Sequence, residues 1–431
     1  MRAVYIPIET TKRELHGKLF LALSLCKLGC TVFLGSKQEV SRYARALGGG
    51  VYLDKGYHPG VSDDIYTELL MNKTKTVLLD EENAVDFADF QQLHQRFPRE
   101  LFGLVSSIYL WGYRQKSELE VKHGIDVIKN VLVTGHPRFE LLQEEYSHIY
   151  DLERKRYSEY GDFILINTNF GLGNNVRSRD SVLKTYGSRF PQLGRLVNYQ
   201  AKQMNNFKDL AIFIKKNTPY NVVIRPHPEE SLEPYCKAFY DLDGIFVDQK
   251  GSAIPAILAA RAMVHHDCTT ALECAMLGRD SIAYIPMLEA DLTTDIPVRV
   301  SLTATNPEEL LAHLRTDLHA GNNINVDILR DYFNFPNNSR LQIAEDIFRQ
   351  SSQSKEWRLF GRSRYYLINI VSRLNALILG KSDALSRVKL DGLTMDECKR
   401  ICSELEGSKF SMDYELKELA PHLFRLRARD C

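Results

Sequence analysis

Short aliphatic runs alternate with longer stretches of helical periodicity along most of this chain, and this rhythm restricts the fold more than any other feature. In the first third, strands are predicted at Ala3–Pro7, Cys30–Leu34, Val51–Leu53, Thr76–Asp80, Leu104–Tyr109 and Asn130–Thr134. A helix with one apolar stripe is expected at Arg13–Leu28, and Gly29 ends it. Strands that alternate with helices at this spacing indicate βαβ units and a parallel sheet.

The rhythm is interrupted once, by the polar, tyrosine-rich stretch Glu144–Tyr160, and then restarts. Strands are predicted in the second part at Asp162–Asn167, Asn221–Arg225, Gly244–Val247, Arg261–His265 and Ser281–Ile285. We therefore expect an α/β fold with two Rossmann-like parallel-sheet domains, 1–155 and 156–340. From about Asn306 only helices are predicted, so residues 341–431 are expected to form a helical C-terminal tail.

The tail contains a basic and aromatic segment, residues 354–380, with apolar residues at helical spacing and interleaved arginines. One interpretation is an amphipathic helix that lies on an anionic membrane surface. The other is a helix that packs back across the domains with its arginines in solvent. Both interpretations stay open at this point.

Composition excludes several classes of protein. The 55 Lys and Arg residues balance 55 Asp and Glu residues, so no global charge favours nucleic acid as a partner. The first residues lack the apolar core of a signal peptide, and no run is apolar enough to span a membrane. We expect a cytoplasmic protein; if residues 354–380 form the membrane-surface helix, it would be peripheral at the inner membrane. The eight cysteines form no C-x-x-C pair, so neither a structural zinc nor a disulfide framework is expected.

The segment Asn221–Glu230 reads as a buried strand followed by a stiff turn, Arg-Pro-His-Pro. Ligands of open α/β sheets bind where parallel strands end. Arg225 and His227 would reach that edge, and Pro228 with the two glutamates after it could open the next helix. Arginine and histidine suit a departing phosphate, because one supplies charge and the other a proton or hydrogen bond. The alternative is a structural turn with Arg225 salt-bridged and His227 as a cap.

A second strand-loop-helix segment runs from Ala262 to Gly278. Thr269, Thr270 and the amides of the helix start would form a phosphate site. Thr270 and Glu273 have the spacing of a capping box, and Glu273 could equally reach ribose hydroxyls. His265, His266 and Asp267 are adjacent, so their side chains alternate between the two faces of a strand and one shared metal ion is not expected.

Two further loops follow predicted strands. In the loop after the first of these strands, Asn167 and Asn169 lie two residues apart and so face the same side, and Gly171 permits close backbone approach. The glycine pattern of this loop is not a dinucleotide fingerprint. In the first half, Glu9 follows one strand and Asp80 and Glu81 follow another, so Glu9 could converge with Asp80 or Glu81 across the sheet edge. Either Glu9 or Glu81 could serve as the general base for an acceptor hydroxyl. Acid-rich helix starts are the ordinary alternative.

Six segments together resemble a known family. They are IPIETTKRELHGKLFLALSLCKLGCTVFLGS, LLDEEN, VTGHPRFELL, ILINTNFG, VIRPHPEE and HHDCTTALECAMLGRDSIAYIP. They look like the bacterial surface-carbohydrate biosynthesis proteins encoded among lipopolysaccharide and capsule genes, over about the first 340 residues. That group is similar to GT-B glycosyltransferases that use CMP-activated ulosonic acids, such as Kdo, sialyl- and polysialyltransferases.

The resemblance implies a metal-independent glycosyltransferase without a cofactor, acting between a CMP-activated sugar and a glycan or glycolipid acceptor. His227-Pro228 would correspond to the family's His-Pro motif, and Thr269-Thr270 to its Ser/Thr pair; both contact the CMP phosphate. The family places its acid or base variably, so none is carried over.

The residues and the resemblance together give two sets of site candidates. The donor-binding candidates are Asn167, Asn169, Gly171, Arg225, His227, Pro228, His266, Thr269, Thr270 and Glu273. The catalytic candidates are Glu9, Glu81 and His227. The rival interpretations are a UDP-sugar-dependent transferase or epimerase of the same architecture, and a non-catalytic scaffold at the membrane surface.

Overall fold

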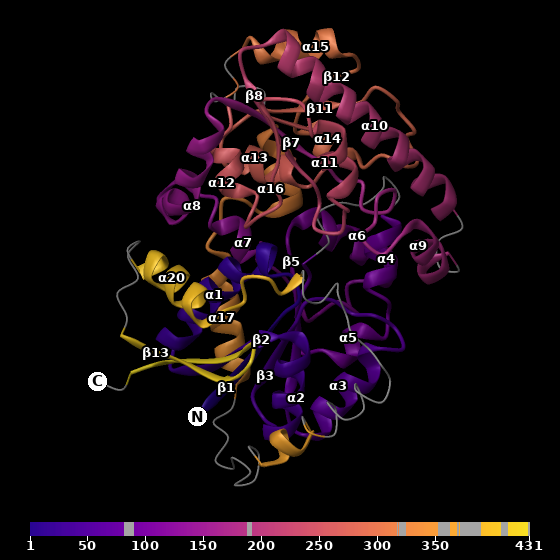
Figure 1. The fold of residues 1–431 in the computed structure, drawn as a ribbon. Helices are drawn as coiled ribbons and strands as arrows, with labels where there is room; N and C mark the ends of the chain where they lie inside the picture. The colour runs from indigo at the N-terminus through magenta and orange to yellow at the C-terminus, as the bar shows by residue number, and fades with distance from the viewer. Residues whose placement is uncertain are drawn as a thin grey trace. The chain divides into compact units, whose positions relative to one another are not determined.

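The computed structural model describes residues 1–81, 90–187, 192–316, 318, 325–351, 363–368, 370, 389–406 and 413–429. The chain forms two compact units (Figure 1). Unit 1 contains the described residues of 1–84, 90–149 and 329–431, and unit 2 those of 150–328. Each unit has its own predominantly parallel sheet, which confirms the predicted α/β fold with two Rossmann-like sheets.

The described strands of unit 1 form one sheet in the order β13-β14-β2-β1-β3-β4-β5-β6. Their bounds are β1 Arg2–Ile8, β2 Cys30–Ser36, β3 Val51–Asp54, β4 Lys75–Leu79, β5 Ser107–Leu110, β6 Val131–Val133, β13 Tyr414–Ala420 and β14 Leu423–Ala428. The first six strands pair in parallel, and β14 pairs antiparallel with β2 and with β13. The first crossover is α1, which buries the predicted stripe of Leu15, Leu19 and Leu23.

The helices of unit 1 connect these strands or pack on them. They are α1 Thr11–Lys27, α2 Lys37–Leu47, α3 Ser62–Met71, α4 Gln91–Arg96, α5 Leu101–Leu104, α6 Tyr113–His123, α7 Pro137–Glu140, the 3-10 helix Glu144–Tyr150, α17 Ser339–Gln350 and α20 Met395–Glu406. The helix α16 (Val326–Phe333) lies where the chain passes from unit 2 back to unit 1.

The described strands of unit 2 form the sheet β12-β11-β10-β7-β8-β9, with all neighbours parallel. Their bounds are β7 Phe163–Asn167, β8 Asn221–Arg225, β9 Ile245–Val247, β10 Ala262–His265, β11 Ser281–Tyr284 and β12 Leu302–Ala304. The helices are α8 Asp151–Lys155, the 3-10 helix Arg156–Tyr160, α9 Arg179–Tyr186, α10 Leu193–Asn217, α11 Glu233–Phe239, α12 Ile254–Ala259, α13 Thr270–Met276, α14 Asp295–Arg299 and α15 Pro307–Leu314.

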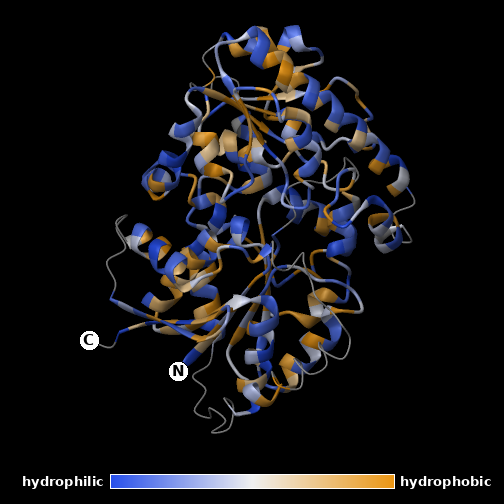
Figure 2. Cartoon of the chain, in the orientation of Figure 1, coloured by the Kyte–Doolittle hydropathy of each residue, from blue (hydrophilic) through white to orange (hydrophobic). Residues whose placement is uncertain are grey.

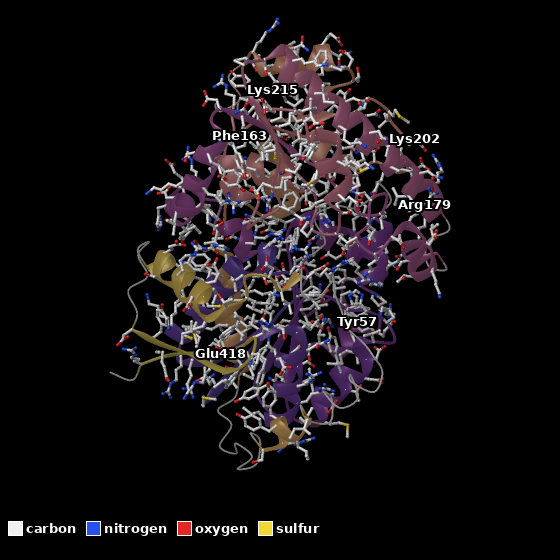
Figure 3. The ribbon with its side chains drawn as sticks, viewed as in Figure 1. Tyr57, Phe163, Arg179, Lys202, Lys215 and Glu418 are labelled. Carbon is white, nitrogen blue, oxygen red and sulfur yellow. The ribbon has the colours of Figure 1, made fainter. Side chains whose placement is uncertain are left out.

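The core of unit 2 lies between its sheet and α10. Ile164 and Ile166 of β7 point to one face, where they pack with Phe207 and Ile214 of α10. Figure 2 shows the strands of this sheet coloured as hydrophobic. Residues in odd positions of β7 point to the other face, and Figure 3 shows Phe163 within the unit, whereas Arg179 and Lys202 lie at its surface.

The C-terminal region differs from the expectation of helices alone. It contains helices, but β13 and β14 form a hairpin that extends the sheet of unit 1. Leu423, Phe424 and Leu426 of β14 are buried. The chain returns to unit 1 at Leu329, ahead of the boundary expected at residue 340, because α17 packs on α1 and α7.

The segment 354–380 lies outside the described residues except for 363–368, which is helical, and residue 370. Tyr365 of this helix is buried and packs edge-on against Tyr43, with ring centroids 5.0 Å apart.

Candidate functional site

The strand order of unit 2 fixes where a ligand would bind. The chain proceeds from β7 to β8 and β9 on one side and then to β10, β11 and β12 on the other. Loops after β7 and β10 therefore diverge at the carboxyl edge of the sheet, and ligands of open α/β sheets bind at such a point. Asn167, the last residue of β7, pairs in register with Arg225 of β8 and His265 of β10. The loops predicted from the sequence thus start at one level of three adjacent strands.

Buried polar atoms at this edge lack hydrogen-bond partners among the described residues. Asn167 is 2% exposed; its amide nitrogen lies 3.3 Å from the sulfur of Met263, but its Oδ1 has no partner. The hydroxyl of Thr270 and Nδ1 of His265 are also buried without one. The neighbour of the Thr270 hydroxyl is the thiol of Cys268, a weak hydrogen-bonding group. Native proteins rarely leave such atoms unsatisfied unless water, an ion or a ligand completes them.

His227 lies in the turn after β8 with a defined ring orientation. Its Nδ1 accepts the backbone N–H of Glu229 at 3.2 Å, so the neutral ring carries its proton on Nε2. A Cβ on Gly171 would stand 3.4 Å from that Nδ1, which puts the β7 loop against the histidine. Two predicted loops therefore meet at His227 and Gly171. Asn169, which lies in the sequence between the end of β7 and Gly171, is half-buried.

Glu230 joins these loops, and sequence reasoning missed its role. Its side chain is 1% exposed and accepts hydrogen bonds from Thr168, Phe170, His227 and Tyr235. Pro228 and the glutamates after it were expected to open the next helix, but α11 begins only at Glu233. The intervening residues form a turn around the Glu230 carboxylate. The only sequence signal for this role was a glutamate soon after the Arg-Pro-His-Pro turn. That pattern looks the same as the acidic start of a helix.

Arg225 is buried and its guanidinium serves the protein itself. It donates to the carbonyl of Lys250 at 2.9 Å and to the carbonyl of Gly251. Gln249 in the same segment donates to the carbonyl of His227 at 2.7 Å. Arg225 therefore holds the loop after β9 against the His227 turn. This structural role differs from the direct phosphate contact predicted from the sequence.

His266 points to the opposite face of the sheet from His265, as the strand alternation predicted. His265 contacts Ser301 through Nε2 at 2.8 Å, and burial lowers its pKa to about 3, so the ring is neutral. His266 lies 3.0 Å from Asp267 through Nδ1 and 3.1 Å from both Tyr199 and Gln203 of α10 through Nε2. Both nitrogens of His266 are thus engaged within the protein.

The second predicted loop ends at α13 much as expected. Thr270 is the first residue of the helix, and the exposed Thr269 precedes it with no side-chain capping bond. The capping box predicted for Thr270 and Glu273 is therefore not formed, because Thr270 already has a helical place and is not the cap. Glu273 is half-buried on the first turn.

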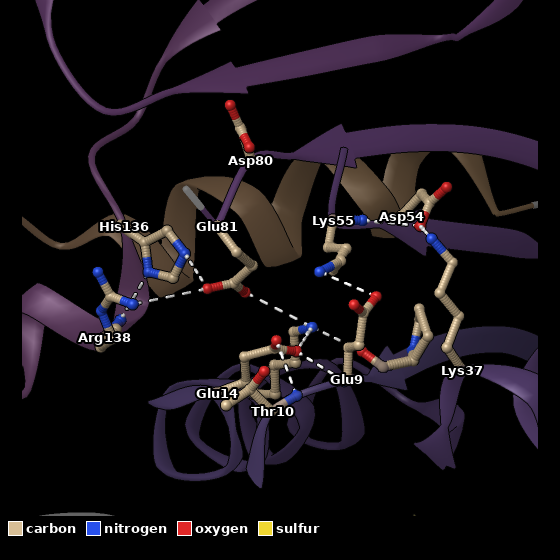
Figure 4. A network of polar contacts seen from close by, with 12 residues as sticks. Glu9, Thr10, Glu14, Lys37, Asp54, Lys55, Asp80, Glu81, His136 and Arg138 are labelled. Atoms are coloured by element: carbon tan, nitrogen blue, oxygen red, sulfur yellow. Dashed lines mark hydrogen bonds and ion pairs between the residues drawn. The ribbon is translucent and has the colours of Figure 1, made fainter. Parts of the chain in front are cut away.

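Unit 1 gathers charged side chains at the carboxyl edge of its own sheet (Figure 4). Glu9, after β1, pairs with Lys55, after β3, at 2.9 Å, and Lys37 pairs with Asp54 at 3.1 Å. The Glu9 side chain is 37% exposed. Burial alone would raise the pKa of Glu9, but Lys55, with smaller contributions from Lys37 and Lys389, lowers it to about 2.

Glu81 lies at the same edge, fully buried among basic side chains. Lys18 is 3.5 Å away, His136 is 3.2 Å away and Arg138 is 4.0 Å away. Burial acts to raise the pKa of Glu81, yet these neighbours hold it well below its ordinary value. Nδ1 of His136 accepts the N–H of Arg138 at 3.0 Å, so the proton of the neutral ring is on Nε2, toward Glu81.

Lys18 links this group to Glu9. Its ammonium donates to the Pro7 carbonyl at 2.6 Å and to Glu14 at 2.7 Å, and Glu14 accepts the backbone N–H of Glu9. The predicted convergence of the two acidic loops is present, and Lys18, His136 and Lys55 complete it. Asp80 points elsewhere, to an ion pair with Arg96. Sequence reasoning missed these basic side chains, because Lys18, inside a helix, reads as a solvent-exposed residue, and Lys55 and His136 come from other loops of the chain.

Within the described parts of the chain, no group of three or more His, Cys, Asp and Glu side chains is arranged to hold a metal ion. None of the helices described there is long and apolar enough to cross a membrane.

No protein-family model matches this sequence, and no curated protein matches it. Many solved structures are similar in fold, among them the following two. The wall teichoic acid polymerase TagF matches with a TM-score of 0.51 and 9% sequence identity, over 81% of this chain and 88% of that one. The UDP-GlcNAc 2-epimerase from Methanocaldococcus jannaschii matches with a TM-score of 0.50 and 11% identity, over 81% of this chain and all of that one.

The common feature is the fold. Identities of this size leave the chemistry to be argued from the site, since one fold hosts many reactions. The two similar folds agree with the GT-B-like architecture of two Rossmann-like units expected from the sequence.

Proposed function

We propose that this protein is a glycosyltransferase of bacterial surface-polysaccharide biosynthesis that uses a CMP-activated sugar, of the 3-deoxy-ulosonic or sialic acid type, without a metal. Unit 2 binds the nucleotide donor, and unit 1 binds the glycan or glycolipid acceptor. The support is the GT-B-like fold, the His-Pro and Thr-Thr motifs at one edge of unit 2, and the carboxylates at the corresponding edge of unit 1.

The observation that carries the proposal is the set of unsatisfied buried polar atoms at the switch point of unit 2. Asn167 Oδ1 and Thr270 Oγ1 are among the described groups that have no hydrogen-bond partner. A nucleotide phosphate or ribose would supply the donors and acceptors that these atoms lack. Glu273, one turn into α13, is the candidate for a ribose hydroxyl.

In the proposed reaction, the bond between the anomeric carbon and the phosphate oxygen breaks while the acceptor oxygen forms the new bond. His227 donates a hydrogen bond from Nε2 to the departing phosphate, and Thr269 and Thr270 add hydroxyl donors. One phosphate leaves instead of a pyrophosphate, so less negative charge has to be neutralised. His266, held by α10, supports the Thr269 loop from behind and does not itself contact the donor.

Unit 1 contributes the acceptor for the proton of the incoming hydroxyl. Of the two candidates, Glu9 is 37% exposed and Glu81 is fully buried, so we assign the contact to Glu9 and the support of the site to Glu81. The low pKa keeps Glu9 ionised near neutral pH. The ionised carboxylate can then accept a hydrogen bond from the incoming hydroxyl.

The test is isothermal titration of the purified protein with CMP, UDP and CDP in the absence of added metal. We expect CMP to bind and His227→Ala to weaken the binding strongly. Tighter binding of UDP would overturn the ulosonate donor in favour of a UDP-sugar transferase or epimerase, the class to which one structural relative belongs. Binding of no nucleotide would favour the non-catalytic scaffold.

We also propose that the protein attaches peripherally to the inner membrane through residues 354–380. Within the described part, Tyr366, Leu367 and Ile370 are 57%, 62% and 57% exposed. Sedimentation with vesicles containing anionic lipid should be lost in a Leu367→Glu, Ile370→Glu double variant. Unchanged sedimentation of that variant would contradict the attachment.

A further inference from the structure

We infer that Glu230 is a positioning residue: its buried carboxylate holds His227 and the loop after Asn167 in the geometry that binds the nucleotide. This inference rests on the proposed function, because it assigns a role within the same site. It goes beyond the phosphate-contacting motifs, since Glu230 itself is too buried to touch a ligand.

The carboxylate is the meeting point of three chain segments. On Oε1 it accepts the Thr168 hydroxyl at 2.7 Å and the Phe170 N–H at 3.0 Å, both from the loop after β7. The same oxygen accepts the His227 N–H at 3.0 Å. On Oε2 it accepts the hydroxyl of Tyr235, on α11, at 2.6 Å.

The charge of the carboxylate matters for this arrangement. Three donors share Oε1, and two of them are backbone N–H groups, which cannot reverse their role. A glutamine oxygen could accept these three bonds while its NH2 group faces the Tyr235 hydroxyl, which can accept. Glutamine removes the negative charge, however, and hydrogen bonds to an ionised acceptor are about twice as strong as neutral ones.

The ties around Glu230 are reinforced on the next residues. Ser231 N–H donates to the Asn174 carbonyl at 2.9 Å, and Asn174 returns a side-chain bond to the Ser231 carbonyl at 2.8 Å. The β7 loop and the β8 turn therefore move as one piece, and His227 faces Gly171 at a fixed distance. Glu230 sets the position of His227 through its backbone, while His227 contacts the ligand.

The experiment is a double-mutant cycle of Glu230→Gln and His227→Ala, read by isothermal titration with CMP, or with UDP if UDP binds more tightly. We expect Glu230→Gln to weaken nucleotide binding at least about tenfold, because the hydrogen bonds that hold the His227 turn and the β7 loop lose their charge assistance. In the His227→Ala background it should change the residual affinity less than about twofold, because the pair acts as a unit.

Three further variants separate positioning from general stability. Glu233→Gln removes the same charge three residues away at an exposed site and should bind like the wild type. Tyr235→Phe removes the bond to Oε2 and a longer bond of 3.4 Å to the Thr168 hydroxyl, but none to Oε1; it should lower the melting temperature while changing affinity less than about twofold. Thr168→Val removes one bond to Oε1 and should weaken binding by about threefold; it tests the inference even if Glu230→Gln fails to fold.

Additive effects in the cycle, or a Thr168→Val affinity equal to that of Tyr235→Phe, would overturn the positioning role of Glu230. If the wild type still binds the nucleotide in that case, the proposed function stands. Absence of nucleotide binding by the wild type itself would overturn both.

Discussion

At the residue scale, the most informative side chains are polar groups that burial leaves without partners. An unsatisfied buried hydroxyl lowers the stability of a fold, so a chain that keeps one gains something from it elsewhere. Thr270 is such a residue in unit 2. The sequence motif named it as a phosphate ligand, and the structure adds the physical reason to examine it first.

Thr270→Val should weaken nucleotide binding about tenfold without lowering stability. The valine removes a hydroxyl that has no hydrogen-bond partner in the described structure and keeps the shape of the side chain. Titration with the nucleotide and thermal unfolding measure the two effects. Thr303→Val, at an exposed position of β12, is the matched control. A fall in melting temperature with unchanged affinity would mean that the hydroxyl is structural.

Glu81→Gln should destabilise unit 1 by about 3 kcal/mol at pH 7, because it removes the buried carboxylate charge that faces Lys18 and Arg138 and leaves Lys18 with Glu14 alone of its two buried carboxylates. The folded-state pKa of Glu81 is depressed, so its contribution is fully present above the unfolded value of about 4.5 and is lost as the pH falls below it. The difference between wild type and variant in urea unfolding should therefore shrink between pH 5 and pH 3. A constant difference across this range would contradict the assignment.

At the element scale, the edge of the first sheet depends on a close backbone approach. Gly35 of β2 faces the turn between β13 and β14, and a Cβ there would stand 2.1 Å from the carbonyl oxygen of His422. The hairpin thus covers the open edge of β2 at a position that only glycine permits. An uncovered edge would present unpaired N–H and C=O groups to other chains.

Gly35→Ala should displace the hairpin and cost at least about 2 kcal/mol of stability. Gly194→Ala is the control, because that glycine lies in α10 with no atom within 4 Å of its Cβ position, and alanine favours a helix. Chemical denaturation of the two variants measures the contrast. Equal stabilities would show that the hairpin is not tightly seated.

The parallel strands could be predicted from the sequence because each is a buried aliphatic run between helices. The hairpin could not, since β13 and β14 carry charged residues on their exposed positions and resemble amphipathic helix. The site was predictable where a strand ends in a polar loop, as at Asn167 and His227. It was not predictable where partners come from distant segments, as Lys18 and His136 do for Glu81.

At the scale of the whole molecule, each unit has its own cluster at the carboxyl edge of its own sheet. The cluster of unit 2 is hydrogen-bonded around Glu230, and that of unit 1 is ionic around Glu9 and Glu81. The proposed function divides donor and acceptor chemistry between them. Sequence could suggest two halves, but it could not show that residues from 329 onward belong with the first, because that is a matter of long-range packing.

Glu9→Gln should lower kcat by about a hundredfold or more while leaving the Kd of the nucleotide unchanged. His227→Ala should instead raise the Kd of the nucleotide, because it removes a ligand contact in the other unit. Steady-state kinetics with a CMP-activated sugar, beside the titration, provide the comparison. If Glu9→Gln impaired nucleotide binding as strongly as His227→Ala, the division of labour between the units would be wrong.

The path of the chain through unit 1 bears on how the protein is made. Synthesis proceeds from the N-terminus, and domains tend to fold as they emerge. All strands of unit 2 leave the ribosome before β13 and β14, which complete the sheet that begins with β1. The nascent first unit therefore waits with its β2 edge uncovered while the second unit folds. During that interval a chaperone has a defined strand to protect, and a ribosome stalled before residue 413 would release a chain prone to aggregate through it.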